Sequence, residues 1–136
     1  FCRHGKSWNH AQEMTQRLNK ETNCKVRLFD LANKELLKKE ISESAILTNA
    51  TNVGMAPNED QSIIEDPTMF HAQLVVSDVI YNPRETKLMK LAKEAGCPTF
   101  NGLYMLLYQG AEAFRLWTGT DMPVAHIKEK YFREKE

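Results

Sequence analysis

Apolar and polar residues alternate along this chain of 136 residues with two different spacings. In residues 8–22 and 103–117 the apolar positions recur every three or four residues, which is the period of an amphipathic helix. Residues 45–49 and 74–80 are instead short apolar runs, typical of buried strands. Glycine, proline and small polar residues separate these blocks, as loops require.

Weaker signals predict the remaining elements. We expect strands at 25–29 and 98–100, a helical turn within 61–68, and helices at 33–40, 86–95 and 124–130. Ser7, Asn33 and Thr86 are suited to cap helices, and Gly96 to end one. Strands and helices then alternate throughout, which predicts an α/β fold: a doubly wound parallel sheet between two helical layers, a three-layer sandwich of the dinucleotide-binding type.

The helix predicted at 103–117 has a pronounced apolar face. Its members recur at steps of three and four: Leu103, Leu106, Leu107, Gly110, Phe114 and Trp117. We expect this face to pack on a core.

Composition excludes several classes of function. Eighteen basic and eighteen acidic residues leave no net charge, which argues against binding to nucleic acid or to a membrane surface. No apolar run reaches the roughly 18 residues of a membrane helix. The three cysteines are far apart and lack histidine partners at metal spacing, so we expect no disulfide framework, no metal site and a cytoplasmic location.

Three ordered motifs carry a family resemblance. They are N-x-T-x-x-G-M at 49–55, D-x-x-Y-x-P-x-x-T at 78–86, and G-x-x-M-L-x-x-Q-G-A-x-x-F-x-x-W-T-G at 102–119. Together they resemble the C-terminal, nucleotide-binding half of shikimate and quinate/shikimate dehydrogenases. The resemblance covers nearly the whole chain and implies that residues 1–136 are the C-terminal part of a Rossmann-like NAD(P)-binding domain, including its C-terminal helices.

The first strand and glycine-rich turn of such a domain have no counterpart here, since no G-x-G-x-x-G loop occurs. Residues 1–3 read like the end of a strand, so we expect an N-terminally truncated domain. The family's catalytic lysine and aspartate belong to a separate N-terminal catalytic domain, and no catalytic residue is assigned in this chain. A sheet without its first strand exposes an edge, which leaves open the pairing of two copies as a homodimer.

The resemblance also implies which residues bind the cofactor and the substrate. At the cofactor we expect Cys2, Arg3, His4, Thr51, Asn52, Val53, Met55, Val79, Gly102 and Met105. Tyr81 and Gln109 are expected at the substrate, where a phenol and an amide can form hydrogen bonds. Asp78 is expected to brace its loop. No acidic residue stands among residues 1–7 to bind a ribose, so the choice between NAD and NADP stays open.

The resemblance therefore implies an oxidoreductase of the shikimate pathway of aromatic amino-acid biosynthesis, which transfers hydride between NAD(P) and shikimate or quinate. One alternative is a non-catalytic domain that binds a dinucleotide or acts as a scaffold. Another is a related dehydrogenase with a different substrate, such as glutamyl-tRNA reductase or a folate dehydrogenase. Gln109 and Tyr81 argue against the latter.

Overall fold

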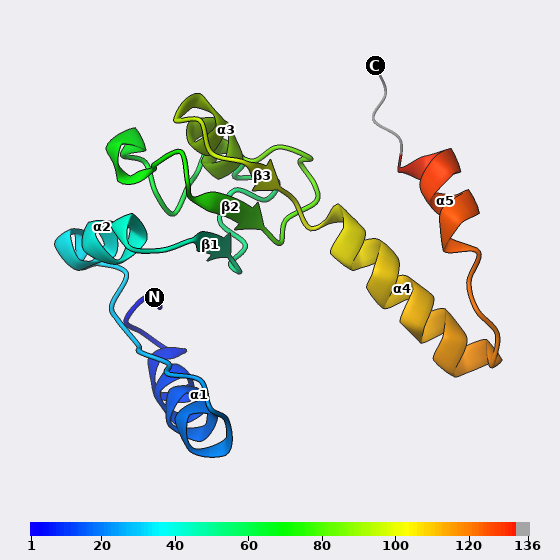
Figure 1. The fold of residues 1–136 in the computed structure, drawn as a ribbon, viewed down its shortest axis with the longest axis horizontal. Coiled ribbons are helices and arrows are strands. Elements are labelled where there is room, and N and C mark those ends of the chain that lie inside the picture. Colours follow the sequence, from blue (N-terminus) through cyan, green and yellow to red (C-terminus); the bar gives the residue numbers. More distant parts are fainter. Residues whose placement is uncertain (133–136) are drawn as a thin grey trace. The chain divides into compact units, whose positions relative to one another are not determined.

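The computed structural model describes residues 1–132, which belong to two compact units, one formed by residues 1–44 and the other beginning at residue 45. The first unit contains α1 (Trp8–Glu21) and α2 (Lys34–Ser42). The second contains β1 (Ile46–Asn49), the short 3-10 helix η1 (Pro67–Met69), β2 (Val75–Asp78), α3 (Lys87–Glu94), β3 (Thr99–Phe100), α4 (Leu103–Thr118) and α5 (Val124–Tyr131) (Figure 1). Every predicted helix is confirmed to within two residues.

The helices of the first unit follow their sequence signals. On α1 the half-buried positions are those of the apolar pattern: Trp8, Ala11, Met14, Thr15 and Leu18. Ser7 stands at the N-cap position, yet its side chain makes no capping hydrogen bond. On α2 the Asn33 side chain does cap the helix, because its Oδ1 accepts from the amide of Leu36 at 3.0 Å.

The strand predicted at 25–29 is reduced to one parallel bridge between Cys2 and Asp30. The physical reason lies in α1, where the Asn19 carboxamide forms hydrogen bonds with both backbone groups of Val26. Asn19 Nδ2 donates to the Val26 carbonyl at 2.8 Å, and the Val26 amide donates to Asn19 Oδ1 at 2.8 Å. At Val26 a side chain therefore satisfies the backbone groups that a neighbouring strand would otherwise pair. Farther along, the Phe29 carbonyl and the Leu31 amide form hydrogen bonds with the backbone of Cys2.

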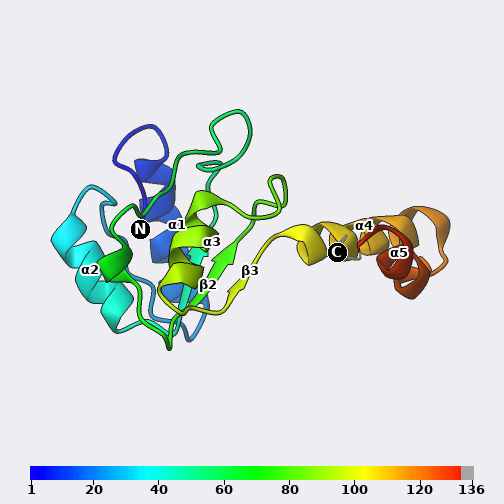
Figure 2. The ribbon, with the colours of Figure 1, turned by 90° about the horizontal axis from the view of Figure 1, so that it is seen from above.

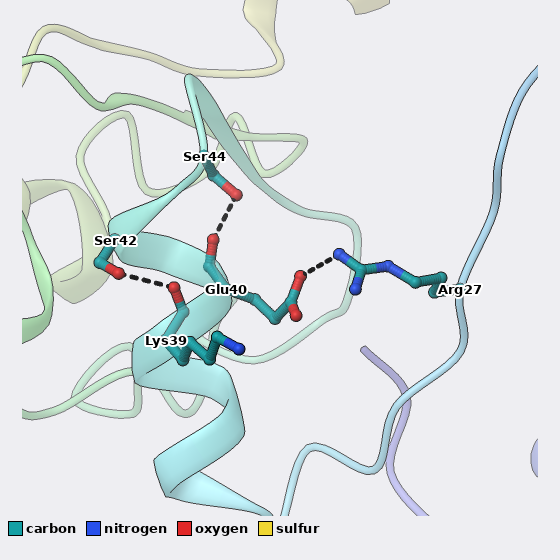
Figure 3. Close-up of polar contacts among 5 residues, drawn as sticks. All are labelled: Arg27, Lys39, Glu40, Ser42 and Ser44. Atoms are coloured by element: carbon teal, nitrogen blue, oxygen red, sulfur yellow. Dashed lines mark hydrogen bonds and ion pairs between the residues drawn. The ribbon is translucent and has the colours of Figure 1, made fainter.

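An ion pair connects the extended segment before Asp30 to α2 (Figure 3). Arg27 Nη2 lies 2.5 Å from Glu40 Oε2, and the Arg27 guanidinium also lies over the Phe29 ring, 5.2 Å from its centroid. At the end of α2, the Ser42 and Ser44 hydroxyls donate to the carbonyls of Lys39 and Glu40 at 2.7 and 2.6 Å. These bonds satisfy carbonyls that the last turn of a helix leaves without amide partners.

The second unit is built on a parallel sheet with the strand order β1-β2-β3. Ile46 to Asn49 pair in register with Val75 to Asp78, and Val76 pairs with Thr99. The α3 helix contacts β2 and β3 (Figure 2) and buries Leu88, Met89 and Ala92. The predicted parallel α/β arrangement is confirmed for these strands, and their carboxyl ends meet at one edge of the sheet.

The prediction that the apolar face of α4 packs on a core is wrong for most of the helix. Leu107 is its one buried residue, whereas Trp117 is 84% exposed. The helix continues from the end of β3 and contacts α5 (Figure 1), where the Tyr104 and Phe132 rings stack at 6.3 Å. Periodicity identifies an apolar face but not the surface that covers it. Within residues 1–132, no helix is both long enough and apolar enough to cross a bilayer.

Candidate functional site

The candidate site lies where the three parallel strands end. Asn49 and Asp78 are the last residues of β1 and β2, stand opposite each other in the register, and are each 1% exposed. The Val79 amide donates to the Asn49 carbonyl at 3.0 Å, and the Gly102 amide donates to the Ile80 carbonyl at 3.1 Å. Backbone hydrogen bonds thus join the end of β1 to the loop after β2, and that loop to the segment after β3.

The Asn49 carboxamide shapes the loop after β1. Its Oδ1 accepts from the Thr51 amide at 3.0 Å and from the Thr51 hydroxyl at 2.7 Å. Its Nδ2 donates to the Val53 carbonyl and to the Asp78 carboxylate, each at 3.2 Å. Because donors surround Oδ1 and acceptors surround Nδ2, only one orientation of this amide satisfies all of these bonds.

The Asp78 carboxylate joins the loop after β2 to the start of α3. It accepts from the Ile80 amide at 3.0 Å and from the Thr86 hydroxyl at 2.8 Å, in addition to Asn49. Thr86 in turn caps α3, since its Oγ1 accepts from the Met89 amide at 3.4 Å. All of these contacts come from donors, so Asp78 braces the loop, as expected.

Two glycines bring backbone close to these loops. Gly102 is buried, and a Cβ at this position would overlap the carbonyl oxygen of Val79. Gly54 has φ +97°, and a Cβ there would lie 3.2 Å from the Gln61 carbonyl oxygen and 3.6 Å from Thr86 Cβ. Only glycine meets both requirements without displacing its neighbours.

A cleft of about 1110 Å³ opens beside this edge of the sheet. Three of the predicted cofactor residues line it, namely Val79, Gly102 and Met105. Charged residues lie at the same cleft, and a hydrogen bond from Lys93 holds the pKa of the Glu85 carboxyl below its ordinary value. The cleft therefore combines apolar side chains, a glycine and a few charges, which is the usual composition of a small-molecule site.

The other predicted residues of the second unit lie outside the lining of the cleft. Thr51, Asn52, Val53 and Met55 share the loop after β1, where Val53 is half-buried and the other three are exposed. Tyr81 and Gln109 are both exposed, Tyr81 after β2 and Gln109 one turn beyond Met105 on α4. Their assignment to cofactor and substrate stays a prediction.

Cys2, Arg3 and His4 belong to the first unit. Cys2 forms the bridge with Asp30, Arg3 is exposed, and the His4 ring stacks on Trp8 with 4.5 Å between centroids. Within residues 1–132, no group of three or more His, Cys, Asp and Glu side chains is arranged to hold a metal ion.

Sequence reasoning left several residues of the site unassigned. Thr86 was expected only as a helix cap, yet it also binds Asp78. Lys128 on α5 and Phe132 just after this helix reach the cleft, with the Lys128 Nζ 4.6 Å from the centroid of the Tyr104 ring. The sequence does contain a signal for the bond between Asp78 and Thr86. A polar residue ends a buried strand, and a threonine suited to cap a helix follows it eight positions later.

Comparison with known proteins identifies a matching family and similar proteins. Residues 102–130 match the family described as the shikimate 5'-dehydrogenase C-terminal domain. A shikimate dehydrogenase (NADP(+)) of Listeria innocua is 47% identical over 132 residues, which cover 97% of this chain and 45% of the relative. A quinate/shikimate dehydrogenase of Escherichia coli O139:H28 is 42% identical over 129 residues, 95% of this chain and 45% of that protein.

A solved structure shares the fold. The crystal structure of shikimate 5-dehydrogenase from Listeria monocytogenes, in complex with shikimate and NAD, matches with a TM-score of 0.88 and 46% identity. The match covers 93% of this chain and 44% of that one, so this chain spans about half the length of the curated relatives it matches. The Rossmann-like fold class is thereby confirmed, and the chain belongs to the shikimate dehydrogenase family.

Proposed function

We propose that this chain is the cofactor-binding part of a shikimate or quinate dehydrogenase that uses NAD or NADP. The observation that carries the proposal is the joining of three strand ends at one edge of a parallel sheet, through Asn49, Asp78 and Gly102. Ligands of open α/β sheets bind at this edge. The 47% identity to a shikimate dehydrogenase over almost the whole chain supports the same reaction.

The cleft fits the nicotinamide end of such a cofactor. Gly102 adds no side-chain bulk to the cleft, and Val79 and Met105 offer apolar surfaces for a flat ring. The cofactor, once bound, would exchange hydride at C4 of its nicotinamide ring, which the oxidised form accepts and the reduced form donates. The work of these residues is to orient the ring and to limit the access of water. We assign Thr51, Asn52, Val53 and Met55 to the same cofactor, farther along the loop after β1.

At the adenosine end we assign Cys2, Arg3 and His4. Arg3 and His4 are exposed, and the segment 1–7 contains no carboxylate that would repel a phosphate. An arginine suits the 2'-phosphate of NADP, whereas a carboxylate would suit the ribose of NAD. We therefore expect NADP to be accepted, and Arg3→Ala to raise the KM for NADP more than the KM for NAD.

At the substrate we assign Tyr81 and Gln109. Both are exposed, and both carry groups that can donate and accept hydrogen bonds with a hydroxylated ring acid. We expect Gln109→Ala to raise the KM for shikimate or quinate about tenfold, the value of one lost hydrogen bond of about 1.4 kcal/mol. Gln12→Ala, an exposed glutamine on α1, is the matched control. An unchanged KM in the Gln109 variant would contradict this assignment.

The proposed partner of this chain is an N-terminal catalytic domain of the same enzyme. The relatives are about twice as long, and the catalytic lysine and aspartate of the resembled family lie outside the part matched here. The exposed Leu116 and Trp117 on α4 offer an apolar surface for that domain. We place the enzyme in the cytoplasm, which the scattered, unpaired cysteines support.

The decisive test is an assay of the full-length protein with shikimate and quinate, each with NAD and with NADP. We expect turnover in at least one of the four combinations. If none is turned over, the proposed activity is wrong. Binding of a dinucleotide without turnover would instead support the non-catalytic alternative.

A further inference from the structure

We propose that Asp78 is a positioning residue, which acts with Asn49 and Thr86 to set the spacing of the loops around the nicotinamide end of the site. This inference rests on the proposed function. Asp78 borders the cleft, whereas Asn49 and Thr86 do not. Because each of the three is only 1% exposed, we expect none of them to form a direct hydrogen bond with cofactor or substrate. Their effect on the reaction would pass entirely through the loops that they hold.

The carboxylate of Asp78 is bonded to three separate parts of the chain. Asn49 Nδ2 reaches both of its oxygens at 3.2 Å, the Ile80 amide reaches Oδ1 at 3.0 Å, and the Thr86 hydroxyl reaches Oδ2 at 2.8 Å. These donors come from the end of β1, the loop after β2 and the start of α3. A single buried group therefore fixes three backbone segments relative to one another.

Each of these bonds leads on to a residue of the proposed site. Asn49 also holds the loop after β1, because its Nδ2 donates to the Val53 carbonyl. The Ile80 amide lies between Val79, which lines the cleft, and Tyr81. A shift of Asp78 would consequently move both the proposed nicotinamide contacts and the proposed substrate contact.

Thr86 strengthens this coupling from the opposite side. Its hydroxyl donates to Asp78 while accepting from the Met89 amide, so both functions of the hydroxyl group are used. Its Cβ and Cγ2 lie 3.6 and 3.7 Å from where a Cβ of Gly54 would stand. Thr86 thus packs against the loop after β1 while it anchors the loop after β2.

Substitutions can separate positioning from simple structural support. Asp78→Asn would turn an amide donor toward the donors Asn49 and Thr86. Thr86→Val removes the hydroxyl but keeps the shape of the side chain, and Thr86→Ser keeps the hydroxyl. Leu74→Ala is the matched control, because Leu74 is fully buried at the amino end of β2, away from the loops.

The experiment measures steady-state constants, the Kd for NADPH and thermal unfolding, all on the full-length protein. We expect Thr86→Val and Asp78→Asn to raise the cofactor KM and Kd about tenfold or more, because a loop that is no longer held in place must be ordered when the cofactor binds. Thr86→Ser should stay within about twofold of wild type. Leu74→Ala should lower the Tm while leaving the KM and Kd of the folded protein unchanged.

A second readout does not depend on the proposed function. Hydrogen exchange should accelerate at the amides of Val53 and Ile80 in Thr86→Val and not in Leu74→Ala. The positioning role is overturned if Thr86→Val leaves both exchange and cofactor affinity at wild-type values. If hydrogen exchange is faster in Thr86→Val but the wild-type protein does not turn over shikimate or quinate, the proposed function is wrong and the role in loop positioning stands. Should Asp78→Asn fail to fold, Thr86→Val and Thr86→Ser still decide the question.

Discussion

Gly102 illustrates how a single residue acquires two independent reasons for its identity. The family resemblance implies a position beside the nicotinamide, where a side chain would take up space. The structure adds a reason that needs no ligand, because a Cβ at Gly102 would overlap the Val79 carbonyl oxygen. Loss of function on substitution of Gly102 would therefore not by itself demonstrate cofactor contact.

We expect Gly102→Ala to destabilise the fold by about 1–3 kcal/mol, since an overlap with backbone cannot be relieved by a rotamer change. Gly110 provides the control, within the helix that Gly102 precedes, because nothing lies within 4 Å of a Cβ built there. Gly110→Ala should be neutral or stabilising by up to about 1 kcal/mol. Chemical denaturation of both variants checks this, and equal stabilities would contradict the close approach of Gly102 to Val79.

The cysteines also differ as individual residues. Burial raises the pKa of the Cys97 thiol, which is 5% exposed and donates to the His71 carbonyl at 3.2 Å, whereas Cys24 is exposed. Because the thiolate is the reactive form, a raised pKa keeps Cys97 protonated and slow to react at neutral pH. We expect iodoacetamide to modify Cys24 readily and Cys97 only after unfolding, as peptide mass spectrometry would measure. Equal rates for both in the folded protein would contradict the burial of Cys97.

At the scale of elements, local chemistry decided which predictions succeeded. Asn33 and Thr86 cap helices as expected, and Gly96 ends α3 with φ +84°. These signals act over three or four residues, so the sequence alone contains them. The strand expected at 25–29 depended on a partner, and within it the backbone groups of Val26 bind a side chain of α1 instead. No local sequence pattern could have predicted that the Asn19 side chain would bind the backbone of Val26.

The two helices of the first unit allow a paired test of capping. Asn33→Ala should lower the free energy of unfolding by about 1 kcal/mol, because the Leu36 amide loses its acceptor. Ser7→Ala should cost much less, because the Ser7 side chain makes no capping bond. Thermal unfolding measures both, and a larger loss for Ser7→Ala would show that its hydroxyl caps α1 in solution.

At the scale of the whole molecule, the sequence identified the loops of the site but not how they are tied together. The motifs mark Asn49, Asp78 and Gly102 as strand ends, and the parallel order places these ends at one edge. The bond between Asn49 and Asp78, however, joins residues 29 positions apart. This bond depends on which strands are neighbours and on their register, and neither can be derived from a single sequence. The same applies to the apolar face of α4, because its periodicity does not indicate which surface packs against it.

The exposed end of α4 leads to a last prediction, which concerns the proposed N-terminal domain. Trp117 is 84% exposed and Leu116 69% exposed, and large apolar side chains exposed close together at the end of a helix usually mark a contact surface. We expect oxidative footprinting to modify Trp117 rapidly in the 136-residue chain and at least about fivefold more slowly in the full-length protein, because burial in a domain contact excludes the oxidant. Unfolded full-length protein supplies the reference rate. Equal modification in the two folded proteins would show that the catalytic domain leaves this surface uncovered, and the apolar end of α4 would then need another partner.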